Sequence, residues 1–302
     1  MINMNRRRFL QTTAATAGAI AASPVLAAKH ALVIDAHLHC FAGKKDLRFP
    51  YHARAPYRPE AAATPEHLLK TMRAAGVDRA VVVHPEPYQD DHRYLEHCLN
   101  VGRGKLKGTI LCFADRPGST DQLPRLAKRG DIVAARVHAY APGRMPPFGK
   151  PELRALWKLA TDHGLALQLH FEPRWCAGFE PLIQEFKETP VLIDHLGRPL
   201  QGTPKEWARV VRWADFPNTH IKLSSLKTSS SYPHRDVRPY VAKLLKAYGP
   251  ARMIYGGGYN ATATGESYRG AREFARSFLK HLKPGEQAQV LGGNAAKLMR
   301  FV

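Results

Sequence analysis

LVIDAHLH, residues 32–39, is the stretch of sequence from which the fold can be worked out. It begins as a run of apolar residues and ends with Asp35, His37 and His39 at every second position. Side chains alternate between the two faces of a β-strand, so these three polar groups point to the same side. An apolar strand with a polar end is typical of a parallel sheet covered by helices, which carries its chemistry at the C-terminal ends of the strands.

Seven similar apolar runs follow this strand along the chain. They begin near residues 77, 107, 132, 165, 191, 220 and 252. Segments with helical periodicity separate or follow them, at residues 65–75, 91–102, 121–129, 151–163, 179–187, 204–214, 237–248 and 268–282. Eight strand-then-helix units predict an α/β protein of the (β/α)8 TIM-barrel class. An open doubly wound sheet alternates in the same way, but no Gly-rich dinucleotide loop follows the first strand.

The composition supports one large globular domain. The chain has 302 residues, of which 44% are hydrophobic, so it can bury a sizeable core and is neither disordered nor fibrous. TIM barrels of about 250 residues form single domains. We therefore expect one barrel domain over residues 28–302.

The first 27 residues resemble a twin-arginine signal peptide. NRRRFLQ, residues 5–11, leads into a segment without charged residues that ends near VLA, residues 25–27, a small-residue cleavage site. The segment contains several polar residues, so it would make a poor membrane span. We expect export to the periplasm without a stable membrane span after cleavage. A protein tethered by an uncleaved signal is the alternative.

The chain is strongly basic, with 45 Lys and Arg against 25 Asp and Glu and a formal net charge of +20. Only three of these cations lie in residues 1–27, so the mature chain keeps a net charge of +17. The basic residues are scattered over the predicted helices, which favours a solvated surface and an anionic small molecule over nucleic acid as a partner. The four cysteines form no CxxC pair and predict neither a zinc ribbon nor a disulfide framework.

Histidines stand at the ends of five of the eight predicted strands. A single strand histidine is usually a hydrogen-bonded structural residue, but burying so many without a function would leave desolvated polar groups unpaired. We therefore expect a functional site at this end of the barrel. The histidines are His37, His39, His84, His138, His170 and His195.

Four motifs together resemble the amidohydrolase-related family of metal-dependent hydrolases. The resemblance spans the chain from about residue 32 to its end, and is closest to the pyrone-dicarboxylate and sugar-lactone hydrolases. It implies a (β/α)8 barrel that hydrolyses a carboxylate-bearing lactone or an amide, or that decarboxylates an aromatic acid. The motifs are DAHLH at 35–39, IDHLGRP at 193–199, IKLS at 221–224 and GNAAKL at 293–298.

The resemblance also implies roles for the histidines. His37 and His39 would bind a metal ion or polarise the substrate carbonyl, and His195 would help to orient it. His170 would complete a set of three neutral nitrogens, with His37 and His39, for one divalent, zinc-like ion. Relatives in the lactone-hydrolase branch can work without metal, so metal-independent chemistry stays open.

Substrate contacts are expected from the neighbouring strands. By the resemblance, Arg136 and Lys222 would hold carboxylates of the substrate, because a guanidinium offers a bidentate fork to a carboxylate. His84 and His138 stand beside them as further substrate-binding residues. A structural ion pair inside the barrel is the alternative for Arg136.

The eighth strand departs from the family pattern. The family reads Tyr-Gly-Ser-Asp there, whereas this chain reads YGGGYN at residues 255–260. Gly258 stands where the resemblance expects the general-base aspartate, and glycine can neither accept a proton nor bind a metal.

Three explanations of this departure remain open, of which one is that the Gly triplet reflects an altered sequence. Another carboxylate can replace the base: Glu172 is the first candidate, and Asp115 the second. Asp194 is expected to point to the opposite face of its strand from His195 and to be a poor base. Alternatively, the chain is a degenerate, non-catalytic barrel that binds a small anion or a metal.

Overall fold

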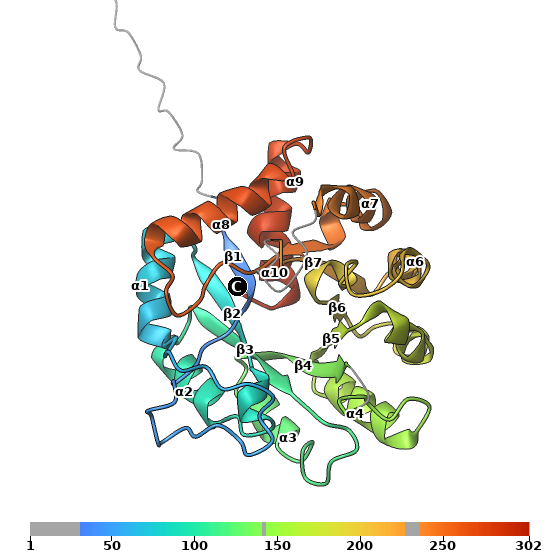
Figure 1. Cartoon of the computed structure of the whole chain (residues 1–302). Helices are drawn as coiled ribbons and strands as arrows, with labels where there is room; N and C mark the ends of the chain where they lie inside the picture. Colours follow the sequence, from blue (N-terminus) through green and yellow to red (C-terminus); the bar gives the residue numbers. More distant parts are fainter. Residues whose placement is uncertain (1–30, 141–142, 227–235, 302) are drawn as a thin grey trace, which may run out of the picture. The chain divides into compact units, whose positions relative to one another are not determined.

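Eight parallel strands surround the centre of the structure, a computed structural model that describes residues 31–140, 143–226 and 236–301 (Figure 1). The strands are hydrogen-bonded in chain order from β1 to β8, and β1 packs against β8 without pairing, which gives a nearly closed barrel. The prediction of eight parallel strands is confirmed. The strands are β1 (Ile34–Leu38), β2 (Arg79–Val83), β3 (Leu106–Leu111), β4 (Ile132–Ala139), β5 (Ala166–Phe171), β6 (Val191–Ile193), β7 (Thr219–Leu223) and β8 (Met253–Tyr255).

Helices lie outside the strands, as in a TIM barrel (Figure 1). The eight predicted helices are all present; α8 is shifted by a few residues toward the N-terminus, and α9 and α10 were not predicted. The predicted signal peptide lies outside the described residues. The helices are α1 (Pro65–Ala75), α2 (Arg93–Val101), α3 (Leu123–Ala127), α4 (Pro151–Asp162), α5 (Glu180–Glu185), α6 (Pro204–Arg212), α7 (Arg238–Tyr248), α8 (Gly265–Ser277), α9 (Pro284–Ala288) and α10 (Asn294–Leu298).

Helix α1 shows how local sequence sets these boundaries. The side chain of Thr64 accepts a hydrogen bond from the backbone N–H of His67, and Pro65 occupies the first turn, where its missing N–H costs nothing. Gly76 ends the helix in the left-handed conformation, at φ 69°, which glycine adopts without strain.

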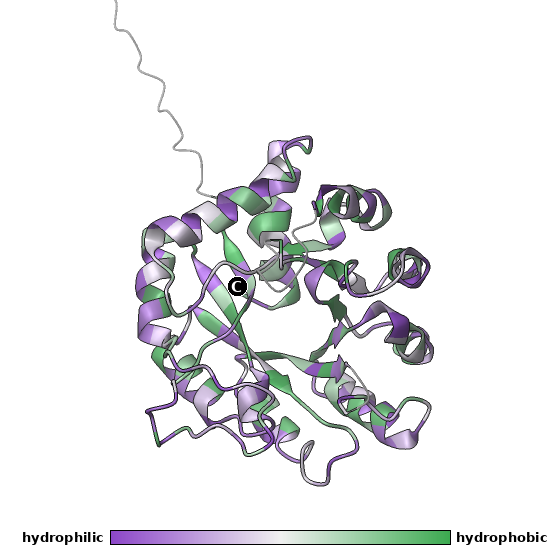
Figure 2. Ribbon diagram, in the orientation of Figure 1, coloured by the Kyte–Doolittle hydropathy of each residue, from purple (hydrophilic) through white to green (hydrophobic). Residues whose placement is uncertain are grey.

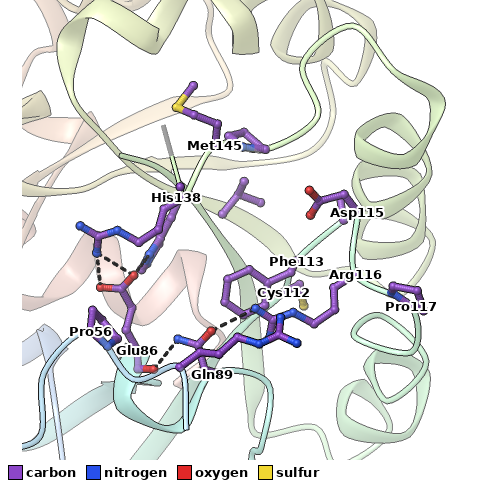
Figure 3. Close-up of a pocket in the computed structure, with 16 residues that line it drawn as sticks. Pro56, Glu86, Gln89, Cys112, Phe113, Asp115, Arg116, Pro117, His138 and Met145 are labelled. Atoms are coloured by element: carbon purple, nitrogen blue, oxygen red, sulfur yellow. Dashed lines mark hydrogen bonds and ion pairs between the residues drawn. The ribbon is translucent and has the colours of Figure 1, made fainter. Parts of the chain in front are cut away.

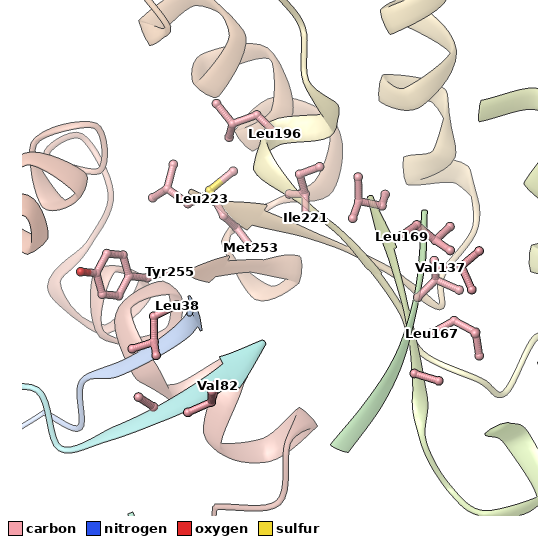
Figure 4. Close-up of a cluster of buried hydrophobic side chains, with 14 of the residues drawn as sticks. Leu38, Val82, Val137, Leu167, Leu169, Leu196, Ile221, Leu223, Met253 and Tyr255 are labelled. Atoms are coloured by element: carbon pink, nitrogen blue, oxygen red, sulfur yellow. The ribbon is translucent and has the colours of Figure 1, made fainter. Parts of the chain in front are cut away.

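The hydrophobic core has two parts. The larger part lies between strands and helices, where Leu38, Val82 and Leu167 pack (Figure 4). A smaller cluster, which includes Ile34 and Val81, is formed by the alternate strand residues together with α10. Figure 2 shows hydrophobic strands and helices with mixed surfaces. The apolar residues of the strands thus form the core.

Two further sequence features can be placed. Within the described residues, no helix is long and apolar enough to cross a membrane. The four cysteines are buried and free.

Candidate active site

The carboxylate of Asp194 is the centre of a buried polar cluster at the C-terminal ends of the strands. Its Oδ2 accepts hydrogen bonds from Arg136 Nε (3.0 Å), Arg136 Nη2 (2.8 Å) and Gln168 Nε2 (3.1 Å). Its Oδ1 lies 3.2 Å from His37 Nδ1 and 3.4 Å from Lys222 Nζ. Burial opposes ionisation, but His37, Lys222 and Arg136 hold the pKa of Asp194 well below its usual range. Asp194 is therefore an anion shared by two buried cations.

The prediction that Asp194 points away from the site is wrong. Strand β6 ends at Ile193, and the following 3-10 turn η3 (His195–Gly197) is left-handed, with φ 56° at His195 and 59° at Leu196. Strand alternation does not extend into such a turn. Left-handed non-glycine residues are strained, and runs of them are concentrated at functional sites. Asp194 still has extended backbone, and the turn that begins at His195 brings this histidine to the same cluster.

Five of the predicted histidines form a row of imidazole rings across this end of the barrel. The ring centroids of His138 and His170 lie 5.0 Å apart, those of His170 and His195 5.2 Å, those of His195 and His37 4.4 Å, and those of His37 and His39 5.3 Å. Burial lowers the pKa of His37 to about 4 and that of His39 to about 3. Both rings are therefore neutral at pH 7.

Hydrogen bonds fix the orientation of these rings. His39 Nδ1 lies 2.7 Å from the carbonyl oxygen of Val83, and His195 Nδ1 lies 2.9 Å from Ser224 Oγ. His37 Nδ1 faces the central carboxylate, whereas its Nε2 is buried without a hydrogen-bond partner. In the tautomer that carries its proton on Nδ1, toward Asp194 Oδ1, the lone pair is left on Nε2. In that tautomer His37 has the arrangement of a base oriented by a carboxylate.

Two cavities adjoin the row. One, of about 530 Å³, is lined by His37, His39 and His195 and by the glycine turn that follows β8. The other, of about 680 Å³, is lined by His138 at the opposite end of the row and by side chains that follow β2, β3 and β4 (Figure 3). The row therefore connects two spaces in which a small molecule can bind.

An ion pair in the larger cavity was not predicted from the sequence. Glu86 Oε1 accepts from His138 Nδ1 (2.9 Å), and Glu86 Oε2 accepts from Arg144 Nη1 (2.8 Å) (Figure 3). Burial opposes ionisation, but His138 and Arg144 lower the pKa of Glu86 to about 2. Glu86 lies in a short turn just after β2 (η1, Glu86–Tyr88), and its position two residues beyond His84 was the available signal.

The structure does not bring three predicted site residues into the cluster around Asp194. Glu172 is bound by Arg174, at 2.5 Å, because the chain turns into a 3-10 helix after β5. Asp115 lines the larger cavity, away from the ion pair of Glu86 (Figure 3). His84 hydrogen-bonds the carbonyl oxygen of Gln89 at 3.0 Å. Neither substitute carboxylate thus lies beside the row of imidazoles.

The turn after β8 has no room for a side chain at Gly258. Its φ is 147°, and a Cβ there would lie 2.8 Å from Cδ2 of Tyr268. Asp35 holds this turn: its Oδ1 accepts from the backbone N–H of Gly257 and its Oδ2 from the hydroxyl of Tyr268, each at 2.7 Å. The expected aspartate is therefore absent together with the space it would need.

Comparison with known proteins identifies the family. Residues 34–301 match the amidohydrolase family model, and the chain belongs to this family. An L-fucono-1,5-lactonase of Burkholderia ambifaria is 28% identical, over 89% of this chain and 95% of the relative. A 4-sulfomuconolactone hydrolase of Rhizobium radiobacter is also 28% identical, over 74% and 73%. The structure of a protein from Pseudomonas putida, assigned as a 2-pyrone-4,6-dicarboxylic acid hydrolase, has the same fold, with a TM-score of 0.74, 21% identity, and coverage of 90% of this chain and 98% of that one.

The three nitrogens predicted to bind a metal do not form one group. Among the described residues, ligand atoms within 4.8 Å of one another are instead offered by His37, Asp194 and His195. His39 donates Nδ1–H to a backbone carbonyl, which leaves its Nε2 as an acceptor, whereas both ring nitrogens of His170 face guanidinium groups. The lone pair of His170 is therefore directed at a cation, which is why it is not a metal ligand.

The remaining donor set does not fit the divalent ion that the family resemblance implies. Asp194 is its single anion, and both carboxylate oxygens already face a buried cation, Arg136 on Oδ2 and Lys222 near Oδ1. A dication would be repelled by both at short range in a site that is shielded from water.

Proposed function

We propose that this protein hydrolyses a lactone that carries an anionic group, by direct attack of water on the ring carbonyl. Membership of the amidohydrolase family and the two lactone hydrolases among its relatives support this reaction class. The observation that carries the proposal is the pairing of His37 with an ionised carboxylate, with its Nε2 free of protein partners beside a cavity.

His37 is the base in this proposal. Its Nε2 accepts the proton of the attacking water while Asp194, 3.2 Å from Nδ1, stabilises the imidazolium that forms. This division of roles between an imidazole and a buried carboxylate is the one used by serine hydrolases. In this proposal, His37 and Asp194 together replace the carboxylate that the family carries on its eighth strand.

His195 supplies the electrophilic contact. Ser224 Oγ accepts a hydrogen bond from the backbone N–H of His195 at 3.3 Å, so its own proton is free for His195 Nδ1 at 2.9 Å. His195 Nε2 then carries a proton that it can donate to the carbonyl oxygen of the lactone. A donor aimed at the developing oxyanion lowers the barrier to ring opening.

The charges of the central cluster favour an anionic substrate. In the larger cavity Arg116 is paired with Asp90 and Arg144 with Glu86, and Arg54 and Asp115 add one charge of each sign. The central cluster adds two cations against one carboxylate. An anionic group on the lactone would be attracted by this surplus of positive charge.

An assay of ring opening tests the proposal. Hydrolysis of a lactone produces a carboxylic acid, so a pH indicator can follow purified protein with a panel of sugar lactones, muconolactones and pyrone dicarboxylates. We expect turnover of at least one anionic member and a loss of about 10²–10⁴-fold in His37→Asn. Equal rates in wild type and His37→Asn would rule out the proposed base.

A non-catalytic anion-binding barrel is the second candidate, favoured by the missing carboxylate at Gly258. It predicts binding of anionic lactones without turnover. Calorimetry with the same panel separates the two candidates, because a degenerate barrel would show heat of binding and no release of acid.

We also propose that the chain is exported to the periplasm by the twin-arginine route, supported by the sequence of residues 5–11. Replacing Arg6 and Arg7 by lysine should retain the protein in the cytoplasm, measured by cell fractionation. Unchanged distribution would contradict this proposal.

A further inference from the structure

Lys222 is unusual among the lysines that the structure describes, because it is fully buried within the barrel. Its Nζ lies 3.4 Å from Asp194 Oδ1 and 3.5 Å from His37 Nδ1. These two atoms are themselves 3.2 Å apart. The ammonium group therefore lies against the edge formed by a carboxylate oxygen and an imidazole nitrogen, which are the donor types that a divalent metal uses.

The charge of this cluster is already compensated without a metal. Arg136 binds Asp194 Oδ2 through two nitrogens, and the ammonium of Lys222 faces Oδ1. Each oxygen of the carboxylate therefore has its own cation. Arg136 and Lys222 have side-chain exposures of 3% and 0%, so water does little to screen them. An added dication would raise the positive charge of a buried site that has one anion.

We propose that Lys222 is the resident cation of this site, and that its ammonium group excludes zinc from His37, Asp194 and His195. The ammonium supplies fixed positive charge beside the reacting groups, as a metal ion does in metal-dependent relatives. Removing that charge leaves Arg136 on Oδ2 of Asp194 and frees Oδ1 beside two imidazoles, in a group whose ligand atoms already lie within 4.8 Å of one another. The loss of one lysine thus turns this site into a zinc site.

Zinc content measures this directly and does not require the lactonase reaction. The full chain and its variants are equilibrated with zinc alone, freed of excess ion and analysed for bound metal. We expect wild type to hold no zinc at this site, and Lys222→Met to hold about one ion per chain. Lys222→Met/His195→Asn should lose that ion, which locates it.

A matched control is Lys243→Met, the same change at an exposed lysine of α7, which should gain no zinc. The proposal is overturned if wild type holds zinc that His195→Asn removes, or if folded Lys222→Met gains none. Lys222→Gln, which keeps a polar head, is the second variant should Lys222→Met fail to fold, and is judged by the same criteria. Because the readout is bound metal, an absence of lactone turnover would leave this result unaffected.

Discussion

Two buried carboxylates, Asp35 on β1 and Asp194 after β6, lie in the same barrel and have opposite surroundings. Asp35 accepts hydrogen bonds from neutral donors: the backbone N–H groups of Gly257 and His37, and the hydroxyl of Tyr268. Burial accordingly raises its pKa. Asp194 faces cations instead, and its pKa is held well below the usual range.

This difference in surroundings gives the two carboxylates different roles. Asp35 holds the glycine turn after β8, so it shapes the wall of the smaller cavity and has no oxygen free for a substrate. Asp194 orients the imidazole of His37 and balances two cations. Under the proposed function, Asp194 after the sixth strand takes the place of the acidic group that the family resemblance expects on the eighth strand.

The largest expected effect separates the two carboxylates. Asp194→Asn leaves Arg136 and Lys222 buried without an anion, which should cost about 3–5 kcal/mol of folding free energy. Asp35→Asn keeps an acceptor for the neutral donors and should cost about 1–3 kcal/mol. Urea unfolding measures both. Equal losses would remove the distinction between the two sites.

A second prediction concerns the electrophilic side of the cluster. His195→Asn should lower kcat for lactone opening by about 10²–10³-fold, because the oxyanion loses its donor. The matched control is His220→Asn, a half-buried histidine of β7 that hydrogen-bonds the carbonyl of Asn218. We expect the control to keep its rate. Comparable losses in both variants would assign His195 a structural role.

The neutral imidazoles predict the pH dependence of stability. Burial lowers the pKa of His37 from 6.5 to about 4 and that of His39 to about 3, so below pH 6.5 the unfolded chain binds more protons than the folded one. This part of the stability is fully present above pH 6.5 and is lost as the pH falls through the folded values. His39→Asn should show a shallower loss in urea unfolding between pH 6.5 and 4. An unchanged slope would mean that the ring is protonated in the fold.

A substitution in the glycine turn after β8 has the smallest expected effect, and this effect is on stability. Gly258→Ala places a Cβ 2.8 Å from Tyr268 at φ 147°, and should destabilise the protein by about 2 kcal/mol. Gly270→Ala, on helix α8 where a Cβ meets nothing within 4 Å, should stabilise it by about 0.5–1 kcal/mol. Thermal unfolding measures both changes. A neutral Gly258→Ala would show that the turn can accept a side chain.

The sequence predicts the barrel well because periodic signals are local. Apolar runs and helical spacing lie within single elements, so the sequence predicts all eight strands. The row of imidazoles is predicted by the histidines at the strand ends. Asp194 and Glu86 could not be placed in this way. A left-handed turn begins at His195, directly after the extended Asp194, so the two neighbours reach the same cluster, and Glu86 lies in a turn where strand alternation does not hold.

Contacts between distant segments also could not be predicted from the sequence. Lys222 was expected to bind a substrate carboxylate, but it pairs with Asp194, which comes from the neighbouring strand's end. The closed space at Gly258 depends on Tyr268 of a different element. Neither partner can be chosen without the register of the sheet and the packing of α8.

The rate of lactone opening by Gly258→Asp tests the central claim, that His37 with Asp194 has taken over from the carboxylate of the eighth strand. The account predicts turnover by wild type and an equal or lower rate in Gly258→Asp, since the new side chain meets Tyr268. A rate about tenfold or more above wild type would show that the site still lacks its base, and would contradict the account.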